Sequence, residues 1–475
     1  MSNKMLKFIF LKQRQPKKRP AEQRKRDFFE IYRRFTKKQA MEQASRCSQC
    51  GVPYCSTKCP VSNYIPNWLK LTTEGRFEEA FAISSETNSF PEICGRICPQ
   101  DRLCEGNCVI ESGFNSVTIG AVEAFITDNA FKHGLIKPII PQKELNKSIG
   151  IIGAGPCGMA AANILRQKGY RVAIYDRYDR AGGLMTYGIP TFKLEKNIVQ
   201  RRQKQLEQSG VDFHFNTVVT SKSGIGSISF KELYGIYDAV FIATGTYKKK
   251  DMWVPGSKLP GVVQALDYLI ASQKTQLSTD MNAKNKHVIV IGGGDTAMDC
   301  LRTAIRQGAK SVKCMYRRDE ATMPGSKMEV KNAKEEGVEF IWQAIPETFI
   351  GGNCVQSITA LRTELEVSEL DNQQTVKPIE NTSFNLPVDM VIKALGFAPE
   401  PISDLWDIND LSLNKYGNIL ITNPPCMTSI PGVFAGGDIV RGASLAVWAI
   451  KDGQDAAHQI SQWLENPTFK KSKLL

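Results

Sequence analysis

Eight of the 13 cysteines of this chain lie between Cys47 and Cys108. Their spacing is short: Cys47-x2-Cys50-x4-Cys55-x3-Cys59-Pro60 is followed by Cys94-x3-Cys98-Pro99 and by Cys104-x3-Cys108. Short spacing that ends in Cys-Pro is typical of ferredoxin-like iron–sulfur sites, whereas zinc usually takes two separated Cys-x2-Cys pairs. The cysteine block therefore predicts metal centres, with iron–sulfur favoured over zinc.

The first of two glycine-rich turns reads Gly153-Ala154-Gly155-Pro156-Cys157-Gly158. It follows an apolar strand predicted over Ser148–Ile152 and opens a helix that we expect to run to about Lys168. These glycines permit a tight turn and bring backbone N–H groups close to a pyrophosphate at the helix N-terminus. Asp176 follows the next predicted strand, where a carboxylate accepts hydrogen bonds from ribose hydroxyls. The turn therefore predicts an unphosphorylated adenosine ribose, as in FAD or NAD.

The second turn reads Gly292-Gly293-Gly294-Asp295-Thr296-Ala297 and lies between a strand predicted over His287–Ile291 and a helix predicted to reach Arg306. The strand after that helix ends in Arg317 and Arg318 rather than in an acid. Two guanidiniums pair with a 2′-phosphate, which a carboxylate would repel. The second site therefore predicts NADP(H); the alternative is that the two arginines are a solvated strand end.

Two further segments fit a flavin site. Ala243-Thr244-Gly245 follows a strand predicted over Ala239–Ile242, and its small side chains suit backbone close to a cofactor. Near the C-terminus, a strand predicted over residues 432–435 leads into Gly436-Gly437-Asp438. Asp438 can bind flavin ribityl hydroxyls, although a helix-capping or turn role is an equal alternative. Two nucleotide sites in one chain are typical of a flavoprotein whose FAD is reduced by NADPH.

The elements that carry these motifs divide the chain into regions. Its 475 residues suggest two to four domains. Around the cysteines, a capping box at Thr36 opens a helix that we expect to end near Cys47, and shorter helices are expected beyond it. Apolar residues within 28–35 also recur at helical spacing, which we attribute to ordinary packing. From Lys147 onward strands alternate with helices, so the fold class is α/β.

The net charge of +13 is concentrated at the N-terminus. Residues 1–46 hold 15 Lys and Arg against four Asp and Glu, so the rest of the chain is nearly neutral. We interpret this basic arm as a docking segment for a partner protein or as a solvated tail, and we expect no nucleic-acid partner. No apolar run is long enough to span a bilayer and no secretory signal is present, so we expect a cytoplasmic protein without membrane contact.

Together these motifs point to a family. Besides the two turns, the chain contains residues 98–106 (CPQDRLCEG), 187–194 (YGIPTFKL), 292–299 (GGGDTAMD), 316–318 (YRR) and 435–438 (AGGD). In this order the motifs resemble those of the small (β) subunits of bacterial NADPH-dependent glutamate synthases. They are also similar to those of the N-terminal half of dihydropyrimidine dehydrogenase. The resemblance runs from about residue 5 to about residue 465.

The resemblance implies two Rossmann-like domains, the NADPH domain inserted in the FAD domain, preceded by an α-helical domain with two 4Fe–4S clusters. The implied ranges are 1–140 (helical), 141–245 and 399–475 (FAD) and 246–398 (NADPH). The residues expected to bind FAD are Gly153, Ala154, Gly155, Pro156, Gly158, Asp176, Gly183, Leu184, Thr244, Gly245, Gly437 and Asp438. Those expected to bind NADPH are Gly292, Gly293, Gly294, Asp295, Thr296, Ala297, Arg317 and Arg318.

The resemblance also implies the cluster ligands. One cluster is expected to be bound by Cys59, Cys98, Cys104 and Cys108, and the other by Cys47, Cys50, Cys55 and Glu123. Glu123 ends the stretch Ile-Gly-Ala-Val-Glu, where dihydropyrimidine dehydrogenase has Ile-Gly-Gly-Leu-Gln with a Gln ligand. The departure from Gln leaves Cys94 as the alternative to Glu123.

The expected function is electron input. By the resemblance, NADPH reduces FAD, and electrons pass through the clusters to a large (α) subunit that holds FMN and makes glutamate from glutamine and 2-oxoglutarate. The chain has no N-terminal Cys nucleophile for glutamine hydrolysis. One alternative is the electron-input subunit of a pyrimidine reductase or of another oxidoreductase. A more distant alternative is a zinc-bearing nucleic-acid-binding protein that uses the basic arm.

Overall fold

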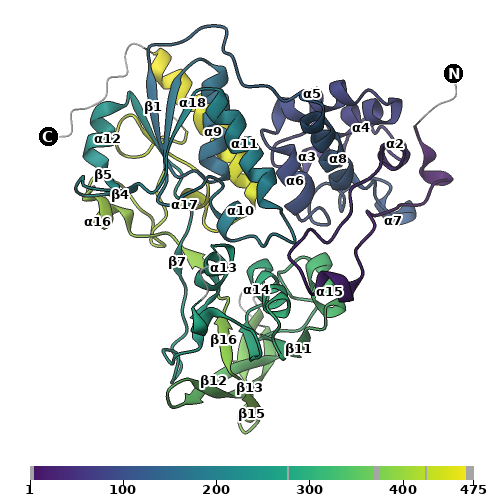
Figure 1. The fold of residues 1–475 in the computed structure, drawn as a ribbon, viewed down its shortest axis with the longest axis vertical. Helices are drawn as coiled ribbons and strands as arrows, with labels where there is room; N and C mark the ends of the chain where they lie inside the picture. Colours follow the sequence, from purple (N-terminus) through teal and green to yellow (C-terminus); the bar gives the residue numbers. More distant parts are fainter. Residues whose placement is uncertain (1–4, 275–277, 368–373, 423–424, 467–475) are drawn as a thin grey trace.

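Three parts of the chain meet at one junction in the computed structural model, which describes residues 5–274, 278–367, 374–422 and 425–466 (Figure 1). The first part, the helical domain, contains the cysteine block. Its helices are η1 (Lys7–Ile9), α1 (Ala21–Arg24), α2 (Lys37–Ala44), α3 (Tyr54–Thr57), α4 (Ile65–Glu74), α5 (Phe77–Thr87), α6 (Pro91–Ile97), α7 (Glu111–Phe114) and α8 (Ile119–Lys132). The core of this domain is built on Trp68, Val122 and Ile126, which are fully buried.

The N-terminal arm folds back on itself, because Lys18 and Tyr32 form an antiparallel bridge. The capping box at Thr36 is confirmed, because the Thr36 hydroxyl accepts from the Gln39 backbone N–H and the Gln39 side chain reciprocates. Residues 28–35, in contrast, are not a helix. The Arg19 N–H donates to the carbonyl of Ile31, and the Arg33 N–H donates to the carbonyl of Lys17. The apolar spacing there reflects packing, as we interpreted it from the sequence.

The second part, the first Rossmann-like domain, is built on a parallel five-stranded sheet in the order β18-β6-β1-β2-β3. The strands are β1 (Ser148–Ile152), β2 (Arg171–Tyr175), β3 (Val211–His214), β6 (Ala239–Ile242) and β18 (Val433–Ala435), with β4 (Val218–Thr220) and β5 (Ser227–Ser229) paired beside them. Its helices are α9 (Pro156–Gln167), α10 (Leu184–Tyr187), α11 (Lys196–Gln208), α12 (Phe230–Ile236), α16 (Ile402–Trp406), α17 (Asp438–Arg441) and α18 (Ala446–Glu465).

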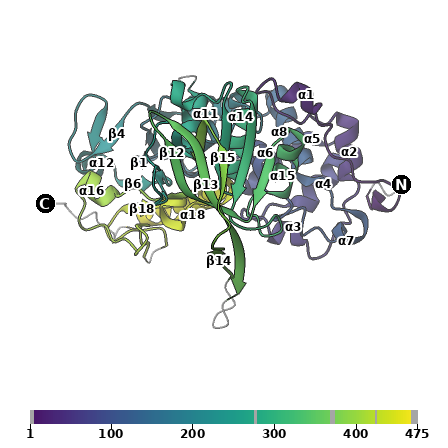
Figure 2. The same cartoon turned by 90° about the horizontal axis from the view of Figure 1, so that it is seen from below.

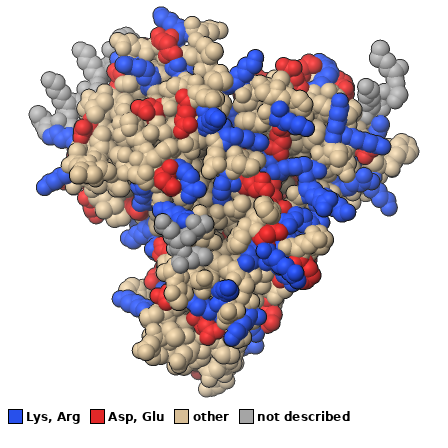
Figure 3. Space-filling model, viewed as in Figure 1, with Lys and Arg blue, Asp and Glu red and all other residues tan. Residues whose placement is uncertain are grey.

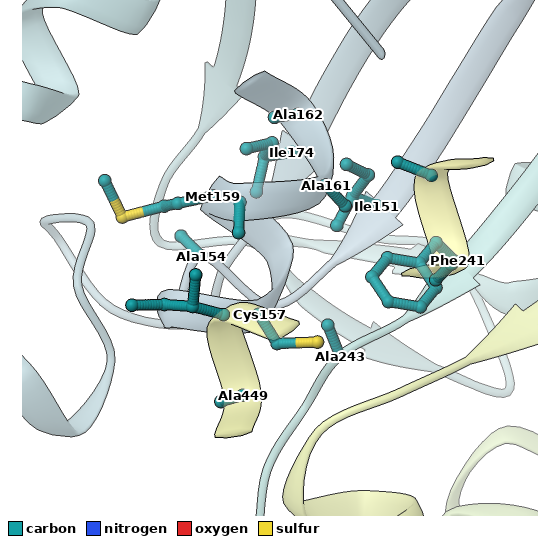
Figure 4. Packing of buried hydrophobic residues seen from close by; sticks show 14 of the residues in the cluster. Ile151, Ala154, Cys157, Met159, Ala161, Ala162, Ile174, Phe241, Ala243 and Ala449 are labelled. Carbon is teal, nitrogen blue, oxygen red and sulfur yellow. The ribbon is translucent and has the colours of Figure 1, made fainter. Parts of the chain in front are cut away.

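Small residues bring the elements of this domain close together. Figure 4 shows Ala161 and Ala162 on α9 beside Ile151, Ile174 and Phe241 of the sheet. Where α18 crosses α9, a Cβ at Gly453 would clash with the carbonyl of Cys157. This close packing fixes the N-terminus of α9 relative to the ends of β1 and β6.

The third part, the inserted domain, has its own parallel sheet in the order β11-β10-β9-β16-β8. The strands are β8 (Val262–Gln264), β9 (His287–Ile291), β10 (Ser311–Tyr316), β11 (Glu339–Trp342) and β16 (Met390–Lys393), and the helices are α13 (Ala265–Gln273), η2 (Thr279–Met281), α14 (Asp295–Arg306) and α15 (Lys327–Glu335). An antiparallel sheet joins β12 (Ala344–Gly351), β13 (Val355–Val367), β14 (Gln374–Pro378) and β15 (Phe384–Pro387), and Figure 2 shows β14 extending away from the body.

The chain crosses between the two Rossmann-like domains twice. The crossings pair as a short ribbon of β7 (Lys248–Lys249) with β17 (Phe397–Ala398). Because β18 pairs with β6 in one sheet, the second sheet is an insertion within the first domain, which confirms the predicted fold class. The residue boundaries given above stay a prediction. No helix among the described residues has the length and apolarity to cross a membrane.

Candidate cofactor sites

A cavity of about 960 Å³ lies where the three parts of the chain meet. Both glycine-rich turns contribute to its wall, the first through Gly153, Gly155 and Pro156 and the second through Asp295 and Thr296. Further predicted residues in its lining are Asp176, Gly183, Leu184, Thr244, Gly245 and Asp438. The predicted residues outside its lining are Ala154, Gly158, Gly437, Gly292, Gly293, Gly294, Ala297, Arg317 and Arg318.

The first turn has the backbone that a pyrophosphate site requires. Gly153 has φ of 109°, and a Cβ there would clash with the carbonyl of Ala243. A Cβ at Gly158 would clash with the Gly153 carbonyl, so α9 packs tightly against the turn. Gly155, which precedes α9, faces open space. The free N–H groups at this helix N-terminus therefore point to a space that can hold phosphate.

Asp176 lies at the carboxyl end of β2 and is 9% exposed. Its Oδ2 accepts from the Ala154 N–H at 2.7 Å, and its Oδ1 accepts from the Tyr178 N–H at 2.8 Å. Burial raises the pKa of this carboxyl, and the two backbone N–H groups oppose that shift. Each oxygen keeps a second lone pair, so Asp176 can bind the turn and accept from ribose hydroxyls.

Two threonines support a cofactor beside the first turn. The hydroxyls of Thr244 and Thr246 are buried and have no hydrogen-bond partner among the described residues. Both residues line the cavity. A buried unpaired hydroxyl is costly, and a polar ligand in the cavity would satisfy it. The residues present therefore fit a flavin nucleotide.

Asp438 occupies the first position of the short helix α17, directly after Gly437. Its Oδ1 accepts from the Ser444 hydroxyl at 2.9 Å, and burial raises its pKa. Because Asp438 also lines the cavity, it combines a helix-terminal position with access to a ligand. The two roles considered from the sequence are thus compatible.

The second turn repeats the geometry of the first. Gly292 has φ of 139°, and a Cβ there would clash with the carbonyl of Ala394 at the end of β16. Gly294 precedes α14 and faces open space. Asp295, at the first position of α14, accepts from the Ser326 N–H at 2.9 Å and pairs with Arg102 of the helical domain at 3.4 Å.

Arg317 and Arg318 follow β10 and lie away from the cavity. Arg317 is exposed and Arg318 is half-buried. The Thr363 hydroxyl donates to the Arg317 carbonyl at 2.8 Å, and the Gln343 N–H donates to the Arg318 carbonyl at 3.1 Å. The backbone of both arginines is thus held, that of Arg317 by β13 and that of Arg318 by the residue between β11 and β12. A 2′-phosphate beyond the turn would meet these side chains outside the cavity.

The cysteines form two neighbouring groups. In the first group, burial raises the pKa of Cys47 to about 11 and that of Cys55 to about 12, and nearby Cys108 adds to both shifts. Cys50 lies close enough to influence both Cys47 and Cys108. These four thiols are therefore close enough to influence one another's ionisation.

The second group surrounds a cavity of about 20 Å³ lined by Cys59, Cys94, Cys98, Cys104 and Glu123. Burial raises the pKa of Cys59 and that of Glu123, to about 12 and about 8. Asn88 donates to Glu123 at 3.1 Å, and the Cys94 thiol donates to the same Asn88 side chain at 3.7 Å.

This placement exchanges two ligands of the grouping drawn from the resemblance. Cys108 lies with Cys47, Cys50 and Cys55, and Glu123 lies with Cys59, Cys98 and Cys104. The cause is the packing of α8 on α6. A Cβ at Gly95 of α6 would clash with the α8 backbone, so the two helices touch and Glu123 faces the second group. We therefore propose the exchanged sets.

The buried thiols of the two groups suit iron–sulfur clusters, which are held by cysteine thiolates. Within the described ranges, no three His, Cys, Asp or Glu side chains are arranged to hold one metal ion, as a tetrahedral zinc site needs. Burial keeps Cys55 and Cys59 protonated near neutral pH. A bound iron–sulfur cluster would supply the positive charge that ionises such thiols.

Sequence reasoning missed a set of charged residues at the cavity. Lys193 Nζ lies 2.9 Å from Asp299 and 3.6 Å from Glu329, and all three line the cavity. Burial lowers the pKa of Lys193, but the two carboxylates outweigh it and the net shift is upward. Lys193 belongs to the YGIPTFKL segment, whose position in the family motif was the available signal.

Comparisons with known proteins agree with these sites. Residues 24–135 match the family described as dihydropyrimidine dehydrogenase domain II, 4Fe-4S cluster, and residues 147–453 match the pyridine nucleotide-disulphide oxidoreductase family. FprA from Mycobacterium tuberculosis in complex with NADPH has a TM-score of 0.56 and 20% identity, covering 69% of this chain and 87% of that chain, which shows a shared fold.

Curated relatives extend over nearly the whole chain. The glutamate synthase (NADPH) small chain of Azospirillum brasilense is 55% identical over 97% of this chain and 96% of that protein. The protein of the same name from Escherichia coli (strain K12) is 44% identical over 98% of this chain and 100% of that protein. The chain is an oxidoreductase with a 4Fe–4S domain, and it belongs to the family of NADPH-dependent glutamate synthase small chains.

Proposed function

We propose that this chain is the electron-input subunit of a glutamate synthase, oxidising NADPH and delivering electrons to a large subunit that makes glutamate from glutamine and 2-oxoglutarate. The observation that carries the proposal is the continuity of the cavity. It joins Gly155 of the first turn to Thr296 of the second, and it reaches Cys98 of the second cysteine group. In this proposal the binding sites of NADPH, which donates the hydride, and of FAD, which accepts it, therefore share one cavity with Cys98, where electrons would leave.

The residues of the chain bind and orient in this proposal. Gly153–Gly158 and Asp176 would hold the FAD pyrophosphate and ribose, and Gly292–Ala297 with Arg317 and Arg318 would hold NADPH. When bound, FAD accepts a hydride and returns electrons singly to 4Fe–4S clusters. Hydride transfer depends on the alignment of the two rings more than on an acid or base. Residues that fix the two nucleotide sites relative to each other are therefore the ones that set the rate.

The segment through which electrons would leave the flavin, residues 98–100, lies beside the first turn. Cys98, Pro99 and Gln100 line the cavity together with Pro156 and Cys157. Cys98 also lines the small cavity of the second cysteine group. A cluster held there would be the nearest acceptor to the flavin site, and the group around Cys47 would follow it toward the large subunit. The many free thiols suit the reducing cytoplasm, where we place the protein.

The proposal is tested by anaerobic purification of the chain with and without a glutamate synthase large subunit. We expect one flavin and about eight irons per chain, as two four-iron clusters require. We expect NADPH to reduce an artificial dye without the large subunit, and glutamate to form only in the complex. Absence of flavin, or NADPH oxidation that never yields glutamate with the large subunit, would contradict the proposal.

The same experiment separates the alternatives. The match to dihydropyrimidine dehydrogenase domain II keeps a pyrimidine reductase open as the partner. Glutamine- and 2-oxoglutarate-dependent NADPH oxidation by the complex supports glutamate synthase, whereas uracil- or thymine-dependent oxidation supports the pyrimidine reductase.

A further inference from the structure

A carboxylate without solvent exposure lies at the junction of the three parts of the chain. Glu336 follows α15 of the inserted domain, and its side chain is 0% exposed. Three guanidiniums surround it: Arg306 at 2.6 Å, Arg302 at 3.0 Å and Arg24 at 3.0 Å. Arg302 and Arg306 belong to α14 of the same domain, whereas Arg24 is the last residue of α1 in the N-terminal arm.

The first Rossmann-like domain reaches the same array through the segment that precedes α11. The ring of Phe192, which is fully buried, lies 4.5 Å from the guanidinium of Arg302 and 3.9 Å from that of Arg306. Next to it, Lys193 pairs with Asp299 and Glu329, and Glu329 pairs with Arg302 at 2.5 Å. Lys193 of the first Rossmann-like domain is therefore neutralised by carboxylates of the inserted domain.

The arm makes further contacts on both sides. Lys18 and Arg24 pair with Glu335 at 2.8 and 2.6 Å. On the other side, the Ile31 N–H donates to the carbonyl of Phe192 at 3.2 Å. In Figure 1 the purple arm runs down to α15, and in Figure 3 basic and acidic side chains are intermixed at this junction. The arm thus crosses from the inserted domain to the first Rossmann-like domain.

The covalent connection between the inserted domain and the first Rossmann-like domain restrains their orientation less than these contacts do. The chain crosses as β7 and β17, a ribbon of two residues on each strand. Domains joined in this way move relative to each other unless an interface holds them. The cavity that joins the two glycine-rich turns exists only while the domains keep their orientation.

We propose that the N-terminal arm is a positioning strap, in which Arg24 completes the buried charge array and holds the inserted domain in the orientation that hydride transfer needs. The inference rests on the proposed hydride transfer between the two sites. It also changes the interpretation of the basic arm as a docking segment for a partner protein. Lys18, Arg19 and Arg24 form ion pairs with acidic residues of this chain.

The test compares Arg24→Gln with Arg26→Gln, which removes the same charge from an exposed position two residues away. In the complete, cofactor-loaded chain, we expect Arg24→Gln to slow NADPH-driven flavin reduction about tenfold, with the affinity for NADPH changed less than about threefold. We expect faster amide hydrogen exchange at residues 190–194 and at β7 and β17. Arg26→Gln should change none of these quantities.

If Arg24→Gln left both the rate of flavin reduction and the amide hydrogen exchange unchanged, the proposal that the arm is a positioning strap would be overturned. If Arg24→Gln fails to fold, Arg24→Lys and Lys18→Gln decide: a smaller slowing with the same exchange pattern supports the strap, and wild-type behaviour of both overturns it. If the wild-type chain itself does not transfer hydride from NADPH to flavin, the proposed function fails, and the exchange pattern still decides whether the arm holds the domains.

Discussion

The two glycine-rich turns solve one steric problem in the same way. Gly153 and Gly292 both have positive φ, and a Cβ on either would clash with a carbonyl from the neighbouring strand end, that of Ala243 or Ala394. Each turn leads directly into a helix whose preceding glycine faces open space. Backbone packing of this kind leaves room for a phosphate at the N-terminus of each helix.

The two turns differ in the residue that follows the next strand of each sheet. Asp176 after β2 is buried and accepts from two backbone N–H groups, whereas Arg317 after β10 is exposed and has its carbonyl held by Thr363. A buried carboxylate is a fixed part of its turn. An exposed guanidinium is held indirectly and remains available to a ligand. We infer from the comparison that the close backbone packing fits a dinucleotide, and that the residue after the second strand decides whether a 2′-phosphate is accepted.

The largest expected effects come from the two turns. Gly292→Ala should lower the affinity for NADPH more than about 100-fold while flavin content stays normal, because the added Cβ clashes with backbone. Gly153→Ala should instead yield protein without flavin. Titration calorimetry and the flavin absorbance measure the two losses. The control is Gly235→Ala on α12, where nothing lies within 4 Å; if the two turn variants lost the same cofactor, the comparison would be wrong.

The next effect concerns nucleotide choice. Replacing both Arg317 and Arg318 by Ala should lower kcat/KM for NADPH about 100-fold and leave that for NADH within about threefold, because only the 2′-phosphate loses its partners. The control is Lys310→Ala, an exposed cation that precedes β10 at its opposite end. A double variant that still prefers NADPH would refute the role of the pair.

Much of this comparison was predictable from the sequence. The bounds of β1, β6 and β9 agree with the predicted strands, because a short apolar run ending in a glycine turn is a local signal. The two turns and the opposite charges after β2 and β10 follow from the same local patterns.

Other features depended on contacts between residues far apart in the chain. Sequence order gave no sign that α8 lies against α6, so the sets proposed from the structure exchange Glu123 and Cys108 relative to the grouping that the resemblance implies. The partner of Arg24 is more than 300 residues away in Glu336, so the arm was interpreted as unpaired. Long-range pairing of this kind has no periodic or spacing signal.

Replacing Thr363 should change the preference for NADPH over NADH less than replacing Arg317 and Arg318 does. Thr363→Val keeps the shape but removes the hydroxyl that donates to the Arg317 carbonyl at 2.8 Å. Because this bond holds the backbone that carries the guanidinium, we expect the ratio of kcat/KM for NADPH to that for NADH to fall about threefold to fivefold. Thr363→Ser should restore the ratio. An equal fall for both nucleotides would indicate a merely structural role.

The smallest effect is the response to salt. Exposed ion pairs are screened at high ionic strength, whereas buried hydrogen bonds are not. Raising the salt from about 0.05 to about 0.5 M should therefore weaken binding of NADPH at Arg317 severalfold and leave flavin bound at Asp176 unchanged. Binding of NADH, which has no 2′-phosphate, is the internal control. If salt weakened NADH and NADPH equally, the phosphate would not be paired with an exposed guanidinium, and the difference between the two sites would lie elsewhere than in the residue after the second strand.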